Sequence, residues 1–166
     1  MFIDGSNLFH ATRELDRSLR LDLVKLRDLL AAGKDLIRAY YYGSALPDAD
    51  ERARKQTAFH HSLAYAGFKT VILPLRQRGG RYVEKGVDVA LAVDLITLAF
   101  DRVYERAILV SGDADYVRAI QEAERKGVRV EVAFFDPPLC SGELRRSARS
   151  FTSLNQLVDR VRRMRP

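Results

Sequence analysis

Aspartate residues occur at three separate places in the chain, and each place adjoins an apolar segment that could form a strand or a helix. Two carboxylates about 4 Å apart repel each other by roughly 4 kcal/mol at an effective dielectric constant of about 20. A cluster of carboxylates therefore needs a counter-charge. Mg²⁺ can supply it, because this hard cation prefers oxygen ligands and also binds phosphates. Such an ion can activate a water molecule and stabilise a leaving oxygen. The five candidates are Asp4, Asp88, Asp94, Asp113 and Asp115.

Each of these aspartates also has a purely structural explanation. Asp4 and Asp113 could form turns after strands, and Asp115 could cap a helix. Asp88 would be favourable in the first turn of a helix. Asp94 lies inside an apolar segment, about 120° around the expected helix from Asp88, and a buried charge there would need a partner such as an arginine. Taken together, the positions favour a shared site over five separate structural roles.

The apolar pattern predicts that strands and helices alternate along the chain. Segment 87–100 is apolar on nearly every face, so we expect a buried helix there. The alternation favours a three-layer α/β domain, Rossmann-like, with a mainly parallel central sheet covered by helices on both faces. Ligands of such sheets lie outside the carboxyl ends of the strands. Strands are predicted at 2–3, 36–42, 68–75, 107–110 and 128–135, and helices at 21–32, 48–66, 87–100 and 114–126.

The composition is that of one globular domain with positive charge concentrated near its C-terminal end. The net charge is +6, and between residues 141 and 166 seven arginines accompany only two acidic residues. This asymmetry indicates a polyanionic partner, although a solvated arginine-rich helix face would also explain it. A single cysteine excludes a disulfide scaffold and a cysteine-based zinc site. The longest apolar segment contains two aspartates and no signal peptide is visible, so we expect a cytoplasmic protein with no membrane partner.

Basic side chains in two segments are candidates for contacts with nucleic acid. The first is 76–81, which we expect to be a basic loop containing two glycines, together with the lysine just beyond it. The second lies in the arginine-rich C-terminal part. Contacts of such residues with phosphates give affinity without sequence information. The candidates are Arg76, Arg78, Arg81, Lys85, Arg145, Arg146 and Arg149.

Three motifs follow one another in the chain: FIDGSNL at 2–8, KGVDVALAVDL at 85–95 and LVSGDADY at 109–116. In this order and spacing they resemble the signatures of the NYN domain family, in particular its LabA-like branch, within the PIN-like nuclease superfamily. The resemblance implies a PIN-like domain over residues 1–150, followed by a basic C-terminal helical extension over 151–166 that packs on the domain or continues it. It also implies a metal-dependent ribonuclease that hydrolyses single-stranded or structured RNA through an aspartate-rich Mg²⁺ or Mn²⁺ site.

The resemblance further implies a role for each matching residue. Asp4, Asp88, Asp113 and Asp115 correspond to positions that bind metal directly or through water. Asp94 matches the second acidic position of the helix motif, and the Asn7 amide could hold a water or a phosphate oxygen. Ser6 and Ser111 could donate hydrogen bonds to the substrate. In one respect the sequence departs from the family, because only three residues precede Asp4 and the first strand is usually longer.

Other functions remain open at this point. A non-catalytic RNA- or protein-binding module of the same fold is the alternative. The carboxylates favour catalysis, because a pure RNA binder gains nothing from carboxylates that face phosphates. Phosphatase-like and Toprim-like chemistry are disfavoured, since the first motif lacks a second aspartate for the former and has Asp4 where the latter has glutamate. An apolar stripe in the C-terminal part could dock on the domain or on a second copy in a homodimer; its members are Leu154, Leu157, Val158 and Val161.

Overall fold

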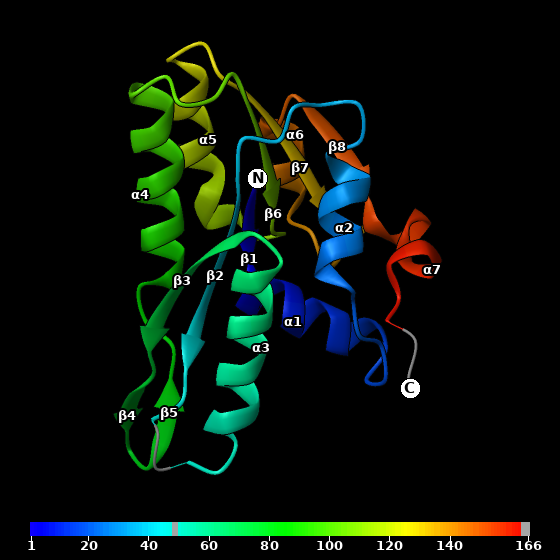
Figure 1. The fold of residues 1–166 in the computed structure, drawn as a ribbon. Helices are drawn as coiled ribbons and strands as arrows, with labels where there is room; N and C mark the ends of the chain where they lie inside the picture. Colours follow the sequence, from blue (N-terminus) through cyan, green and yellow to red (C-terminus); the bar gives the residue numbers. More distant parts are fainter. Residues whose placement is uncertain (48–49, 164–166) are drawn as a thin grey trace.

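The computed structural model describes residues 1–47 and 50–163, and a six-stranded sheet forms its centre (Figure 1). The strand order is β3-β2-β1-β6-β7-β8, and every neighbouring pair is parallel. This arrangement confirms the predicted three-layer α/β fold with a parallel sheet. The strands are β1 (Phe2–Asp4), β2 (Ala39–Ala45), β3 (Phe68–Pro74), β6 (Arg106–Val110), β7 (Arg129–Phe134) and β8 (Ser150–Ser153).

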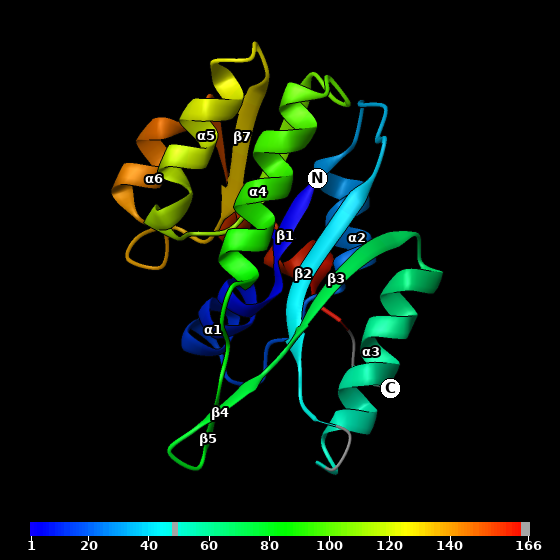
Figure 2. The same cartoon turned by 90° about the vertical axis from the view of Figure 1, so that its left-hand side faces the viewer.

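Helices cover both faces of this sheet (Figures 1 and 2). One face carries α1 (Gly5–Leu15), α2 (Leu23–Leu30), α3 (Ala53–Tyr65) and the short α7 (Val158–Val161) beside α2. The other carries α4 (Val87–Phe100), α5 (Val117–Glu124) and α6 (Gly142–Ser147). Two short 3-10 helices, η1 (Ala114–Tyr116) and η2 (Leu154–Gln156), complete the chain. None of the helices in the described residues has the length and apolarity that spanning a bilayer requires.

The strand order reverses direction between β1 and β6. The chain moves from β1 outward to β2 and β3, then returns to β6 on the other side of β1 and moves outward again to β7 and β8. At such a reversal the connections leave in opposite directions, and α/β domains bind ligands outside the carboxyl ends of the two strands. We refer to this place, beyond the ends of β1 and β6, as the crevice. Asp4 ends β1, and Asp113 lies three residues beyond the end of β6. The sheet therefore brings the first and third motifs together.

The central strand β1 has only three residues, as the short first segment predicts, and all three are buried. Aromatic packing compensates for its length. The Phe2 ring stacks on Tyr40 of β2 at a centroid distance of 5.3 Å and meets Tyr104 edge-on at 5.6 Å. Such pairs stabilise a fold by about 0.5–1.5 kcal/mol beyond the burial of their area. β1 is thereby anchored on its α4 face.

Four predicted elements differ from the structure. The strand predicted at 36–42 runs instead from Ala39 through Gly43 to Ala45. The basic loop is an antiparallel hairpin of β4 (Arg76–Arg78) and β5 (Arg81–Val83), because two glycines with positive φ form the tight turn that hairpins favour. The predicted start, at Asp48, of the helix expected over 48–66 lies outside the described residues, and α3 begins at Ala53. The helical extension predicted over 151–166 does not begin as a helix, because its first three residues belong to the edge strand β8 (Ser150–Ser153), which pairs with β7.

The apolar stripe of the C-terminal part packs on the domain itself. Leu154 and Val161 are each only 1% exposed. Leu157 and Val158, which lie between them in the stripe, pack against the same core. Val161 also accepts a backbone hydrogen bond from Asp22, the N-cap residue of α2, at 2.7 Å. Of the two roles left open for this stripe, the structure shows docking on the domain.

Helix α4 is where the sequence predicts it, but the prediction of burial on nearly every face is wrong. Leu91, Leu95 and Ala99 form one buried face at a spacing of four residues. On the other side Val89, Val93 and Phe100 are 59%, 52% and 53% exposed. A helix in an outer layer contacts the sheet along one stripe only, so composition alone overstates its burial.

The two sides of α4 should therefore respond differently to truncation. We expect Leu95→Ala to lower the free energy of unfolding by about 2–5 kcal/mol, because it opens a cavity against the sheet. Val93→Ala, two residues away and half exposed, should change it by about 0.5 kcal/mol or less. Urea denaturation followed by circular dichroism measures both. Equal losses for the two variants would contradict the one-sided burial of α4.

Candidate functional site

Asp4 ends β1 at the crevice, and the residue is only 5% exposed. One oxygen, Oδ1, accepts a hydrogen bond from the Asn7 backbone N–H at 2.9 Å and so caps α1. The other, Oδ2, accepts a hydrogen bond from the Tyr116 hydroxyl at 2.8 Å. An aspartate N-cap stabilises a helix by about 1 kcal/mol. Asp4 thus joins the end of β1 to α1 and to η1.

The environment of Asp4 disfavours its charged form. Burial raises the pKa of the Asp4 carboxyl above its usual value, and the nearby carboxylates of Glu84 and Asp113 raise it further. The hydrogen bonds from Asn7 and Tyr116 act in the opposite direction but do not reverse the shift. Among the described residues no lysine or arginine forms an ion pair with Asp4. The Asp4 carboxylate therefore accepts hydrogen bonds but has no cationic side chain in contact with it within the described residues.

Asn7 connects α1 to the loop after β6. Its Oδ1 accepts a hydrogen bond from the Gly112 N–H at 2.9 Å. The Ser111 hydroxyl lies 3.2 Å from the same oxygen and 3.4 Å from Asp4 Oδ2, and its single proton can serve one of them at a time. A Cβ on Gly112 would come within 2.5 Å of the Leu139 carbonyl oxygen, so the loop requires glycine there. The amide nitrogen of Asn7 has no partner within the described residues and remains able to donate.

The remaining acidic residues of the predicted site surround the Asp4–Tyr116 pair at different depths. Asp113 is half-buried, and its Oδ1 accepts a hydrogen bond from the Asp115 N–H at 3.0 Å. Asp115 is exposed, and Asp88 is exposed in the first turn of α4. Burial raises the pKa of the Tyr116 hydroxyl, and the charges of Asp4, Asp88 and Asp113 raise it further. Asp88 and Asp113 therefore lie close enough to Tyr116 to act on it electrostatically.

Asp94 has a different environment from the other aspartates. Its Oδ2 accepts a hydrogen bond from the hydroxyl of Tyr42, on β2, at 2.8 Å. The partner expected from the sequence was an arginine, and the structure supplies a tyrosine instead. Asp94 forms no hydrogen bond with Asp4, Asp88 or Asp113 in the described part of the chain. The pair ties the middle of α4 to the sheet and so fixes how the helix presents Asp88.

Glu84 is a member of the site that the sequence analysis missed. It follows the hairpin directly, and its Oε2 accepts hydrogen bonds of 2.5 Å from the hydroxyls of both Ser6 and Ser44. Ser6 was expected to donate to a substrate, but in this structure it donates to Glu84. The only signal in the sequence was the position of Glu84, next to the second motif. That signal was weak because a predicted loop gave no reason for its carboxylate to approach Asp4.

The donor set suits a hard divalent cation in its chemistry. Asp4, Glu84 and Asp113 offer carboxylate oxygens, the ligands that Mg²⁺ and Mn²⁺ prefer. A cation would also provide the counter-charge that Asp4 lacks. No three Asp, Glu, His or Cys side chains within residues 1–47 and 50–163 lie close enough to hold one ion together. Water and substrate phosphates commonly complete the coordination of Mg²⁺ where a protein supplies only one or two carboxylates.

The basic residues predicted to contact phosphates fall into separate groups. Arg76, Arg78 and Arg81 are exposed on the β4–β5 hairpin, which projects beyond the carboxyl ends of β2 and β3 (Figure 2). Lys85 stands alone and is exposed just before α4. Arg149 is not near the crevice, because its N–H donates to the Val130 carbonyl at the opposite, amino end of the sheet. Arg145 and Arg146 are exposed on α6, where Arg145 lies 4.6 Å above the Phe151 ring.

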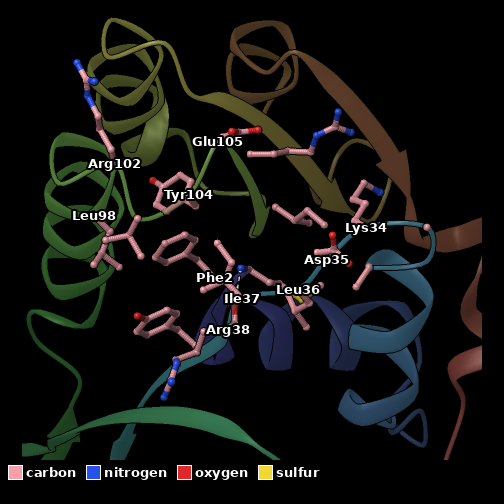
Figure 3. A pocket seen from close by; sticks show the side chains of 17 residues that line it. Phe2, Lys34, Asp35, Leu36, Ile37, Arg38, Leu98, Arg102, Tyr104 and Glu105 are labelled. Atoms are coloured by element: carbon pink, nitrogen blue, oxygen red, sulfur yellow. Dashed lines mark hydrogen bonds between the residues drawn. The ribbon is translucent and has the colours of Figure 1, made fainter.

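A cavity of about 720 Å³ also lies at the amino end of the sheet (Figure 3). Phe2, Leu98 and Tyr104 line one side, and Lys34 and Asp35 lie on the other. None of the predicted acidic residues lines it. The cavity is therefore separate from the crevice.

Three comparisons with known proteins identify the family and the fold of this chain. The family model of the NYN domain matches residues 1–155. The low amplitude and bright protein LabA of Synechococcus elongatus is 25% identical over 179 positions, covering all of this chain and 90% of that protein. An uncharacterized protein of Sinorhizobium fredii is 36% identical over 74 residues, which are 45% of this chain and 35% of that one. The crystal structure of a protein of unknown function from Vibrio parahaemolyticus superposes with a TM-score of 0.75 at 28% identity, covering 92% of this chain and 90% of that one. These matches confirm the resemblance inferred from the three motifs.

The raised pKa of Asp4 predicts that its charge destabilises the fold. When the pKa of a carboxyl is higher in the folded than in the unfolded state, the group contributes stability to the fold. This stability is fully present below the unfolded pKa of 3.8 and is lost as the pH rises through the folded pKa. Asp4→Asn, which retains an N-cap acceptor, should therefore raise the melting temperature at pH 7 in EDTA by several degrees, since 1 kcal/mol corresponds to about 2–8 °C.

Thermal denaturation between pH 3.5 and 8 tests this expectation. The advantage of Asp4→Asn should shrink as the pH approaches 3.8, where the native carboxyl is neutral as well. Asp115→Asn removes an exposed carboxylate of the third motif and serves as the matched control, with little change expected at any pH. A melting temperature of Asp4→Asn equal to or below that of the native protein at pH 7 would show that the charge is not destabilising.

Proposed function

Since this chain belongs to the NYN domain family, we propose that it is a metal-dependent ribonuclease that hydrolyses phosphodiester bonds of RNA at the crevice between β1 and β6. Membership of the family, within the PIN-like nuclease superfamily, suggests a nuclease. The observation that carries the finer proposal is the buried carboxylate of Asp4, which has neighbouring carboxylates and no cationic partner in the described residues. A site of this kind is unfavourable in isolation and becomes favourable when a divalent cation and a phosphate enter it.

In this proposal Asp4 and Asp113 hold Mg²⁺ or Mn²⁺ directly, with Asp88 and Asp115 acting through water. The chemistry that such an ion supplies when bound is activation of a water and stabilisation of charge on the leaving oxygen. The resemblance to NYN domains implies that the products carry a 5′-phosphate and a 3′-hydroxyl. The remaining steps of the mechanism depend on residues of the chain itself.

Three side chains position the reacting groups. Tyr116 donates to Asp4 Oδ2 and fixes the plane of the carboxylate. Asn7 holds the Ser111–Gly112 loop through its Oδ1, which leaves its amide N–H groups free to donate to a phosphate oxygen. Asp94 acts at a distance, because its hydrogen bond to Tyr42 sets the position of α4. Such pre-organised donors stabilise developing charge without reorganisation during the reaction.

The hairpin arginines are placed to attract the substrate. Arg76, Arg78 and Arg81 extend beyond the carboxyl ends of the strands, and Glu84 connects the same hairpin to the crevice through Ser6. Phosphates held on the hairpin would lie at the carboxyl end of the sheet, the end at which Asp4 follows β1 (Figure 2). Arg145 and Arg146 on α6 supply a second group of cations. Arg149 takes no part in this proposal.

A non-catalytic RNA-binding module is the second candidate. The observation that favours it is that no three potential ligands in the described residues are arranged around one point. If this were the function, the arginines would bind RNA and the carboxylates would have structural roles only. Cleavage assays distinguish the two, because binding without cleavage is the expected behaviour of the module alone.

The nuclease proposal predicts metal-dependent cleavage. A labelled single-stranded RNA should be cut in Mg²⁺ or Mn²⁺ and remain intact in EDTA. Asp113→Asn and Asp4→Asn should each lower the rate by about 100-fold or more, since even the partners of metal ligands contribute about 10–100-fold. Gel electrophoresis measures the products, and circular dichroism verifies that both variants fold. Metal-dependent cutting by both variants at the native rate would exclude this site.

The hairpin proposal predicts a change in salt dependence. Replacing Arg76, Arg78 and Arg81 with glutamine should weaken RNA binding and reduce the slope of log K against log salt by up to about 2, because each phosphate contact to a single strand contributes about 0.7. Arg149→Gln, at the other end of the sheet, is the matched control and should leave the slope unchanged. Fluorescence anisotropy at several salt concentrations measures both. Equal slopes for all three proteins would place the binding surface elsewhere.

A further inference from the structure

A second cavity, of about 270 Å³, lies on the face of the sheet opposite to α4, between α1, α2 and α3. The proposed nuclease mechanism does not use it. Leu8, Phe9 and Thr12 of α1 form one wall, and Tyr41 of β2 and Phe59 of α3 form another. This volume is just below the range of about 300–1,000 Å³ that drug-sized ligands occupy, so the cavity suits one small planar group.

The cavity begins next to the acidic crevice. Gly5, which lines it, directly follows Asp4 in the chain. The Tyr41 ring lies so close to Gly5 that any Cβ at this position would overlap the ring. The Tyr41 hydroxyl has no hydrogen-bond partner among the described residues, and it is near enough to Asp4 and Glu84 to experience their charges. An RNA backbone bound at Asp4 would therefore pass beside the cavity wall that Gly5 and Tyr41 form.

The lining combines aromatic rings with cations. Phe9 is 53% exposed and carries the guanidinium of Arg13 at 5.8 Å from its ring centroid. Phe59 meets Tyr41 edge-on at 5.8 Å. Arg20 and Arg163 complete an exposed basic rim, and none of the lining residues is acidic. Aromatic rings beside arginines are the usual surface for stacking single-stranded bases, whereas an apolar peptide would gain nothing from the cations.

We infer that this cavity binds one unstacked nucleobase of a single-stranded RNA whose backbone lies at the acidic crevice. The base stacks on Phe9, and the Arg13 and Arg20 guanidiniums lie beside the adjoining phosphates. Bases within a duplex are paired and stacked, so they cannot enter. The inference deepens the proposed function and rests on it for the identity of the strand, because it selects single-stranded over double-stranded substrate.

Binding measurements in EDTA test this inference without cleavage. The probe is a fluorescently labelled RNA of about 12 nucleotides, within the range that single-strand sites cover. Phe9→Ala should weaken its binding by about 5- to 150-fold, the loss expected for one base–aromatic stack. Phe100→Ala is the matched control, because Phe100 is equally exposed, at 53%, on the other face of the sheet. It should change affinity by less than about twofold.

A series of RNAs, each with one base removed, identifies the bound base. One abasic position should weaken binding to the native protein, and the same RNA should show no further loss with Phe9→Ala, since both changes remove one contact. A duplex of the same sequence should bind equally to the native protein and to Phe9→Ala.

Failure of this inference is distinguishable from failure of the nuclease proposal. Equal RNA affinities of Phe9→Ala and Phe100→Ala, or no binding of RNA by the native protein, would overturn the base site. Additive losses from Phe9→Ala and every abasic position would also overturn it. Base-dependent binding without any metal-dependent cleavage would support the base site and overturn the nuclease. Cleavage that requires Asp113 but is insensitive to Phe9 would do the reverse.

Discussion

The hydrogen bonds to the Asp4 carboxylate hold the functional end of this domain together. Asp4 ends a strand of three residues, and such a short strand has few ladder bonds of its own. Its Oδ1 caps α1 and its Oδ2 joins η1 through Tyr116, so one buried side chain fixes three elements. These bonds reduce but do not cancel the cost of burying the charge, which is why the pKa of Asp4 remains raised. The fold thus retains a locally unfavourable carboxylate, and such positions are characteristic of functional sites.

Successive side chains of β2 point to opposite faces of the sheet, so its three consecutive tyrosines have different neighbours. Tyr40 and Tyr42 lie on the α4 face, where both stack on Phe2 and Tyr42 binds Asp94. Tyr41 points to the opposite face, where it contacts Gly5 and Phe59. One strand therefore braces the helix that carries Asp88 and also forms the floor of the aromatic cavity. The strand can do both next to Asp4 because its side chains alternate between the two faces of the sheet.

The sequence was sufficient to predict five of the six strands of the sheet and the meeting of the first and third motifs. Asp4 and Asp113 follow apolar strands, and parallel strands place such residues at one edge whatever the details of packing. Glu84 could not be found in this way, because its position depends on a hairpin that closes on two glycines rather than on an apolar run. The edge strand β8, with the sequence SFTS, was missed because only one of its residues is apolar.

Other errors had a different origin, in the limits of residue type as a guide to environment. The apolar composition of α4 predicted burial, but a helix in an outer layer buries only one stripe. Asp94 was expected to need a cation, whereas a tyrosine hydroxyl satisfies its carboxylate. Arg149 was grouped with nearby arginines, yet the entry into β8 carries it to the other end of the sheet. In each case the sequence specified the residue and the tertiary structure determined its neighbours.

The charges that would attract RNA and those that would take part in the reaction lie at different depths in the domain. The hairpin arginines are exposed and extend away from the crevice, so their field reaches an approaching polyanion first. The carboxylates lie deeper, with Asp4 nearly inaccessible, and they would repel a phosphate that arrived without a cation. Screening by salt weakens the outer contacts much more than the buried ones. RNA affinity should consequently be controlled mainly by ionic strength, and entry of the phosphate into the crevice mainly by the divalent ion, because the two steps depend on charges at different depths.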